Sequence, residues 1–298
     1  MERADAHLHL FADGYPGRYG RSPSGGQEIS VYQDIRREHG ISRALVVGYE
    51  GEPRFAGNNH YLASLAAVHD WLAPVAYLHP GGPKPGAHRD DHIDPIESGG
   101  RRSQTGDTAP GHWLAAGFVG FAAYLGDRDS ADWFADWLTR HTATVNRAHC
   151  LLSVNAVPAA VARLGPALAA VGDCTVLFSH LGLPGRQPTP PAPATAATIL
   201  APLGELARLP HVGVKVSGLY AVSDPPYDHP HAAARPFVEQ LIEWYGPQRL
   251  YWGSDFPPCL DHVSFAQTLD PVGLAGLSVG EHADVAGRNL LRALGDNG

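Results

Sequence analysis

Cysteine is scarce in this chain of 298 residues, and the three that occur, Cys150, Cys174 and Cys259, are widely spaced. An odd number at such spacing forms neither a disulfide framework nor a Cys-x-x-Cys zinc or redox motif. We therefore expect buried apolar thiols in a reducing compartment, and a cytoplasmic protein. The first residues also lack the basic and apolar pattern of a cleavable targeting signal.

Positive charge is scarce as well. The chain carries 22 Lys and Arg against 30 Asp and Glu, a formal net charge of −8, and Lys84 and Lys215 are its two lysines. A nucleic-acid partner would require a basic face, so we expect none. No apolar run approaches the roughly 18 residues of a membrane span, so we expect no membrane partner either. The expected partner is a small-molecule substrate.

Several nucleotide and metal motifs are absent. The sequence contains no Walker loop, no Gly-x-Gly-x-x-Gly and no His-Glu-x-x-His. These absences argue against a P-loop enzyme, a dinucleotide-binding fingerprint and a helical zinc protease motif.

Short apolar runs alternate with helical patterns along the chain. They predict strands near Ala4–Leu10, Arg43–Tyr49, Ala73–His79, Gly117–Ala122, Cys150–Asn155, Thr175–His180, Val212–Gly218 and Leu250–Ser254. They predict helices at Ile29–His39, Asn58–Asp70, Ser130–Ala143, Pro158–Val171, Thr195–Arg208 and Ala232–Tyr245. Ser130 and Asn58 are expected to cap helix starts, and Gly172 and Gly246 to end helices.

Eight such units in this length predict an α/β fold, a (β/α)₈ TIM barrel forming one domain over residues 1–298. A doubly wound open sheet is the alternative. The connection after the third strand, from Pro80 to His112, is long, polar and rich in Gly and Pro. We interpret it as a loop excursion over the barrel mouth.

The first strand carries two imidazoles in Asp5-Ala6-His7-Leu8-His9. Because alternate strand side chains share a face, His7 and His9 are expected on one face with Asp5 below them. A second pair, His229-Pro230-His231, lies in a Pro-rich stretch and is interpreted as surface loop.

Polar residues also end later strands. Strand five ends at Ser153 and Asn155, strand six at His180 and strand eight at Asp255, while strand seven carries Lys215. In a (β/α)₈ barrel the site lies at these carboxyl ends. Three imidazoles and a carboxylate are N and O ligands suited to zinc or manganese.

The sequence thus predicts one divalent metal, zinc before manganese, with His7, His9, Asp255 and His180 as ligands. A bound ion lowers the pKa of its water to about 7 and polarises a carbonyl. Asp255 would take the water proton and deliver it to the leaving group, and His180 would orient the water or stabilise the oxyanion. The predicted substrate contacts are Asn155, Tyr124, Arg128 and Lys215, with structural pairing inside the barrel as the alternative for Lys215.

Four segments together resemble the amidohydrolase superfamily, in its amidohydrolase-2 branch. They are Asp5-Ala6-His7-Leu8-His9, Ser179-His180-Leu181-Gly182-Leu183-Pro184, Lys215-Val216-Ser217-Gly218-Leu219 and Trp252-Gly253-Ser254-Asp255-Phe256-Pro257. The resemblance runs nearly end to end and implies the barrel, with His7 and His9 as ligands and Asp255 as ligand or base. Within the branch these forms are most similar to lactonases, which implies a hydrolase of a small cyclic ester.

The chain departs from the superfamily pattern at strand five, which reads Leu152-Ser153-Val154-Asn155 where many members have Lys or His. A carboxylated lysine bridging two metals is therefore not expected. Metal-independent action also stays open, because the lactonase branch includes members that work without a metal.

Two rival functions remain. One is a metal-dependent non-oxidative decarboxylase of a small aromatic acid, although that branch usually keeps a strand-five His. The other is a barrel that binds without catalysis, against which both strand-one His and Asp255 argue. Barrels of this kind often pair, so a homodimer is an open oligomeric state.

Overall fold

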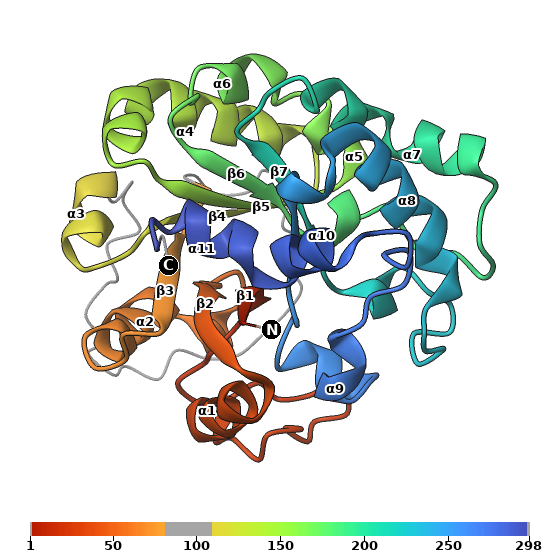
Figure 1. Ribbon diagram of the computed structural model, residues 1–298. Coiled ribbons are helices and arrows are strands. Elements are labelled where there is room, and N and C mark those ends of the chain that lie inside the picture. The colour runs from red at the N-terminus through yellow and green to blue at the C-terminus, as the bar shows by residue number, and fades with distance from the viewer. Residues whose placement is uncertain (1, 81–108, 297–298) are drawn as a thin grey trace, which may run out of the picture.

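Eight parallel strands form the centre of the computed structural model, which describes residues 2–80 and 109–296. Their order is β1-β2-β3-β4-β5-β6-β7-β8, and a parallel bridge between Leu8 and Phe256 joins the first strand to the chain after the last (Figure 1). The strands are β1 (Arg3–Leu8), β2 (Ile41–Val47), β3 (Leu72–Tyr77), β4 (Gly120–Leu125), β5 (Leu151–Ala156), β6 (Thr175–Phe178), β7 (Val212–Val216) and β8 (Leu250–Trp252). The barrel prediction is confirmed, and the open sheet is excluded.

Helices surround this barrel. They are α1 (Glu28–His39), α2 (Asn58–Ala66), α3 (Pro110–Ala115), α4 (Arg128–Arg147), α5 (Pro158–Val161), α6 (Gly165–Ala169), α7 (Pro193–Leu206), α8 (Arg235–Tyr245), α9 (Phe265–Thr268), α10 (Val279–Ala283) and α11 (Asn289–Ala293). The helix predicted over 158–171 is two short helices separated by residues 162–164, and Pro166 lies in the first turn of the second, where proline is tolerated. Most of the predicted excursion from Pro80 to His112 lies outside the described residues.

Local chemistry also corrects two predicted caps. Asp127, and not Ser130, caps α4: its carboxylate accepts from Ser130 N at 2.8 Å in a capping box. Gly57 precedes α2, so Asn58 is its first residue. Gly246 ends α8 as predicted.

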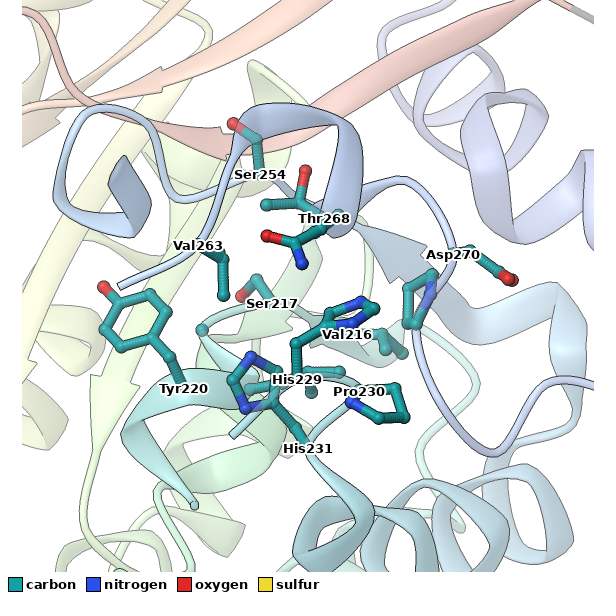
Figure 2. A pocket seen from close by; sticks show the side chains of 15 residues that line it. Val216, Ser217, Tyr220, His229, Pro230, His231, Ser254, Val263, Thr268 and Asp270 are labelled. Atoms are coloured by element: carbon teal, nitrogen blue, oxygen red, sulfur yellow. The ribbon is translucent and has the colours of Figure 1, made fainter. Parts of the chain in front are cut away.

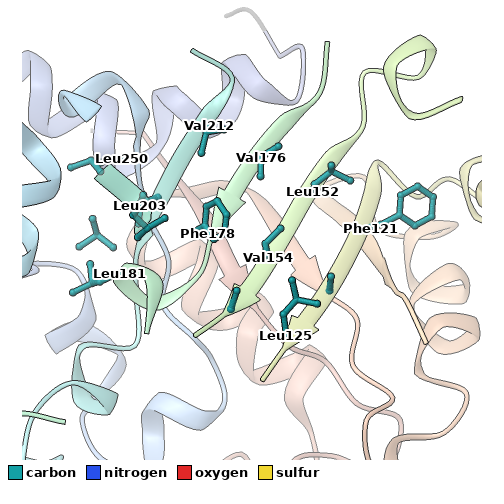
Figure 3. Close-up of a cluster of buried hydrophobic side chains, with 14 of the residues drawn as sticks. Phe121, Leu125, Leu152, Val154, Val176, Phe178, Leu181, Leu203, Val212 and Leu250 are labelled. Carbon is teal, nitrogen blue, oxygen red and sulfur yellow. The ribbon is translucent and has the colours of Figure 1, made fainter. Parts of the chain in front are cut away.

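Two apolar clusters sandwich the strands. Outward-facing side chains pack beneath the helices, as Val154 and Phe178 do near Leu203 of α7 (Figure 3). A smaller cluster fills the barrel interior and includes Leu45, Val75, Ala122, Leu151 and Leu177. Side chains alternate between the interior and the exterior along each strand. Interior positions at the carboxyl ends of the strands are therefore where the polar residues lie.

The first strand breaks its alternation. Ala4 and Ala6 belong to the interior cluster, yet Leu8 belongs to the outer one, and the pairing register with β2 shifts between Asp5 and Leu8. This bulge turns His7 inward while Asp5 points outward to α1. The prediction that Asp5 shares a face with His7 and His9 is therefore wrong.

Among the described residues, no helix combines the length and apolar character needed to cross a bilayer.

Candidate metal and catalytic site

Three predicted ligands converge at the carboxyl end of the barrel. His7, His9 and Asp255 each offer an atom, and these atoms lie within 4.8 Å of one another. The Oδ1 atom of Asp255 lies 3.6 Å from His7 Nε2 and 3.8 Å from His9 Nε2. All three side chains are buried, and burial is the main factor lowering the pKa of both imidazoles. Both histidines are therefore neutral at pH 7, as metal ligands must be.

The chain after β8 brings Asp255 to the first strand. Asp255 N donates to His7 O at 2.7 Å, and His9 N donates to Phe256 O at 2.7 Å. Asp255 has a φ of +57°, in the left-handed region that non-glycine residues seldom adopt. These two backbone bonds hold the strained residue, so the carboxylate faces the imidazoles.

Asp5 supports this junction from outside the barrel. Its carboxylate accepts hydrogen bonds from Tyr32 Oη at 2.8 Å, from Ser254 Oγ at 2.5 Å, and from the backbone N–H groups of Ser254 and His7 at 2.9 and 3.0 Å. Burial nevertheless raises the pKa of Asp5 to about 6. Asp5 therefore ties β1, α1 and the β8 end together.

Lys215 lies beneath the group formed by His7, His9 and Asp255 and is fully buried. Its Nζ donates to Ser153 Oγ at 2.7 Å and contacts His7 Nδ1 at 3.1 Å. Burial lowers the pKa of Lys215 to about 7, against the opposing influence of Asp5 and Asp255. These contacts agree with the alternative expected for Lys215 from the sequence, which was structural pairing inside the barrel.

His180 lies beside the three-residue group and is not one of its members. Its ring centroid is 4.6 Å from that of His7, and its Nδ1 lies 3.1 Å from Ser217 Oγ and 4.0 Å from Asp255 Oδ2. A ligand role for His180 stays a prediction.

Tyr220 is a site residue that the sequence patterns did not reveal. It follows β7 in a short 3₁₀ turn, and its hydroxyl donates to Asp255 Oδ2 at 2.5 Å. Burial, with the charge of Asp255, raises the pKa of Tyr220 well above its usual value, so the phenol remains a donor. We call His7, His9, His180, Lys215, Tyr220 and Asp255 the polar half of the mouth.

Three tyrosines form the opposite side, and we call them the tyrosine cluster: Tyr49, Tyr77 and Tyr124. Tyr124 lies 4.9 Å from Tyr49 and 5.7 Å from Tyr77 between ring centroids, and Tyr49 lies 5.6 Å from Tyr77. Sequence reasoning selected Tyr124 but missed the other two, because aromatic residues at strand ends also occur in ordinary cores.

The remaining predicted residues are Asn155 and Arg128. Asn155 lies near the carboxyl end of β5, beside Tyr124 in the strand register, and is partly exposed, so its substrate contact stays a prediction. Arg128 is exposed at the start of α4. His229 is exposed as expected, but His231 is 5% exposed, so its interpretation as surface loop is wrong.

His231 helps to line a cavity of about 30 Å³ behind the ends of β7 and β8 (Figure 2). Ser217, Tyr220 and Ser254 contribute to the same wall, which places the cavity directly behind the polar half. The volume holds about one water molecule.

The donor set fits one divalent ion. His9 Nδ1 lies 2.7 Å from Val47 O, which fixes its proton on Nδ1 and leaves the Nε2 lone pair facing Asp255. His7 Nε2 is buried without a hydrogen-bond partner in the described part of the chain. A ligating His7 carries its proton on Nδ1, where Ser179 Oγ at 3.4 Å or the uncharged amine form of Lys215 at 3.1 Å can accept it.

Comparisons with known proteins agree with this architecture. A family model described as amidohydrolase matches residues 4–295. The L-fucono-1,5-lactonase of Burkholderia ambifaria is 31% identical over 148 residues, 47% of this chain and 46% of that protein. The match thus spans about half the length of that curated relative.

Solved structures share the fold along their whole length. A zinc-bound amidohydrolase from Burkholderia multivorans has a TM-score of 0.70 at 19% identity, covering 99% of each chain. A probable 2-pyrone-4,6-dicarboxylic acid hydrolase from Acinetobacter baumannii, with citric acid bound, has a TM-score of 0.67 at 16% identity, covering 99% of this chain and 100% of that one. A putative hydrolase of the same name from Pseudomonas putida has a TM-score of 0.66 at 22% identity, covering 99% of this chain and 98% of that one.

Proposed function

Because this chain belongs to the amidohydrolase family, we propose that it is a hydrolase that opens a small cyclic ester with the help of one divalent metal ion. The observation that carries the proposal is the convergence of His7, His9 and Asp255 at the carboxyl end of the barrel. The lactonase relative and the pyrone-dicarboxylate hydrolase neighbours support an ester ring as substrate.

His7, His9 and Asp255 would hold the ion. Zinc is the first choice, since two imidazoles and a carboxylate suit it and a neighbour of the same fold binds it; manganese is the second. When bound, the ion supplies Lewis acidity toward the ester carbonyl and acidifies water. Without an ion, the same acid and base groups would have to work through hydrogen bonds alone.

The protein's own groups then account for the proton transfers. The Asp255 carboxylate accepts a proton as the water oxygen bonds to the ester carbonyl carbon. When the ring C–O bond breaks, that proton passes to the departing alkoxide oxygen. Water is consumed, and the product is one open-chain hydroxy acid.

His180 is placed to assist at the carbonyl. If Ser217 Oγ donates to His180 Nδ1, the ring proton lies on Nε2, and that N–H is available to the developing oxyanion. Tyr220 holds Asp255 Oδ2, which keeps Oδ1 turned toward His7 and His9.

The test is Asp255→Asn, which keeps the shape of the side chain and removes the base. Acid release from lactones, followed by pH-stat titration, should fall about 10³-fold, within the range typical of a lost general base. Asp136→Asn, on the exposed side of α4, should leave the rate unchanged. Release of carbon dioxide from aromatic acids without lactone opening would favour the decarboxylase instead.

A further inference from the structure

The cavity behind the ends of β7 and β8 adjoins His180 through Ser217. Ser217 lines the cavity, its Oγ lies 3.1 Å from His180 Nδ1, and the same oxygen accepts from His180 N at 3.3 Å. The next residue, Gly218, also lines the cavity, and a Cβ there would lie 2.4 Å from His180 Nδ1. One wall of the cavity is therefore the direct support of the His180 imidazole.

A second lining residue, His231, carries a polar atom without a partner. His231 is 5% exposed, and its Nδ1 is buried with no hydrogen-bond partner within residues 2–80 and 109–296. Figure 2 shows His231 and Ser217 in the wall of the same cavity. Burial lowers the pKa of His231 to about 4, so the ring is neutral at pH 7. A buried polar atom of this kind costs stability unless a water or a ligand completes it.

The size and lining of the cavity suit a water molecule and exclude a substrate. Its volume of about 30 Å³ exceeds what one water needs and is far below that of a ligand pocket. The hydroxyls of Ser254 and Thr268, which also line it, already donate to other residues. A buried water needs at least two polar partners, and His231 Nδ1 and Ser217 Oγ can supply them.

The direction of the hydrogen bonds at Ser217 determines which nitrogen of His180 carries the proton. A hydroxyl has one donor and two acceptor positions, and the backbone N–H of His180 occupies one acceptor position of Ser217. A water that donates to the second position leaves the hydroxyl proton for His180 Nδ1. The imidazole then carries its own proton on Nε2, which is the form that donation to an oxyanion requires.

We propose that a buried water, held by His231 Nδ1, donates to Ser217 Oγ and so fixes His180 in its Nε2-protonated form. His231 is thereby a positioning residue, because it acts on the site through the water and Ser217 and touches no substrate. The proposal rests on the proposed ester hydrolysis, in which His180 presents a donor to the carbonyl oxygen. It extends the site to a residue that follows β7 by a loop.

The experiment compares two side chains of similar shape at position 231. His231→Asn keeps polar atoms that can hold the water, whereas His231→Leu removes them. The φ of +64° is open to both, since Asn tolerates the left-handed region and Leu181 and Leu183 of this chain adopt φ values of +57° and +53°. Urea unfolding checks that both variants are folded. Lost packing in the cavity wall would affect both variants, and a lost polar contact only His231→Leu.

Nitrogen NMR of protein labelled in its histidine rings reports which nitrogen of His180 carries the proton, with His180→Gln used to assign the resonances. We expect the Nε2-protonated form in wild type and His231→Asn, and a mixture of the two forms in His231→Leu. In lactone hydrolysis, kcat should fall about tenfold in His231→Leu with KM unchanged, as for a weakened outer partner of a site residue. In His231→Asn it should stay within about twofold of wild type.

The NMR measurement separates this proposal from the reaction itself. If His180 changes its protonated nitrogen in His231→Leu alone but no ester is opened, the positioning role stands and the hydrolase proposal fails. If esters are opened and His180 is the same in all three proteins, the positioning role fails and the hydrolase proposal stands. An Nδ1-protonated His180 in wild type, or equal losses of kcat in the two variants, would also overturn the positioning role.

Discussion

The polar half and the tyrosine cluster face each other across one barrel mouth, built from strands of the same kind, yet they differ in how their side chains are satisfied. In the polar half, buried groups are hydrogen-bonded to one another: Lys215 to Ser153 and His7, and Tyr220 to Asp255. In the cluster, hydrogen bonds hold the backbones of Tyr49 and Tyr77, while Tyr124 Oη has no hydrogen-bond partner among residues 2–80 and 109–296.

This difference indicates that the two sides of the mouth have different tasks. A network that fixes acid, base and metal ligands is suited to stabilising charge that develops during a reaction. Rings on a fixed backbone with a spare donor are suited to choosing what enters. Substitutions in the polar half should therefore affect metal binding and kcat, and those in the cluster should affect substrate preference.

Among substitutions outside His7, His9 and Asp255, the largest effect is expected from a glycine behind His180. Gly218 has a φ of +60°, and a Cβ there would lie 2.4 Å from His180 Nδ1. Gly218→Ala should therefore displace the imidazole and lower kcat/KM about 100-fold, as small misplacements in active sites do. The control is Gly126→Ala after β4, where a Cβ would meet nothing in the described chain within 4 Å. Similar rates in the two variants would show that the position of His180 is unimportant.

A smaller effect is expected from the hydrogen bond behind Asp255. Tyr220→Phe frees Asp255 Oδ2, so affinity for the metal should fall about tenfold, as is typical for outer partners of ligands. Competition with a chromogenic chelator measures it. Tyr124→Phe, across the mouth, should leave metal affinity unchanged. If both variants lose metal equally, the division between the halves is wrong.

The smallest effect concerns the pH dependence of folding stability, and it is expected from His231 in the cavity wall behind the polar half. Burial, followed by the charge of His229, lowers the pKa of His231 to about 4, against about 6.5 when unfolded. Above pH 6.5 neither state binds the proton, and as the pH falls toward 4 only the unfolded state does, so folding stability decreases.

His231→Asn should therefore flatten this loss. Asn tolerates the φ of +64° at this position. Urea unfolding at pH 7 and pH 5 should show wild type losing on the order of 1–2 kcal/mol more than the variant, with activity at pH 7 unchanged. Parallel losses in the two proteins would mean that His231 is protonated as easily when folded as when unfolded.

Much of the polar half could be predicted because its signal is local. His7, His9 and Asp255 stand out as polar residues at the ends of apolar strands, and the barrel fixes where those ends meet. The orientation of Asp5 could not be predicted, because one extra residue in β1 reverses the alternation and leaves no mark in the sequence.

The tyrosine cluster shows a second limit. Tyr49 and Tyr77 end strands as many core aromatics do, and only the three-dimensional register places them beside Tyr124. Their anchors, Asn58 and Asn59, look like helix-start residues in the sequence. Their role depends on backbone partners up to 48 positions away, which no local pattern encodes.

The central claim is that the polar half holds the metal on which hydrolysis depends. Elemental analysis of gently purified wild type, His9→Ala and Tyr124→Phe, with lactone hydrolysis assayed on the same preparations, tests it most directly. The account predicts about one zinc or manganese per chain in wild type and Tyr124→Phe, and loss of both metal and activity in His9→Ala. Full activity in metal-free wild type, or metal retained by His9→Ala, would contradict it.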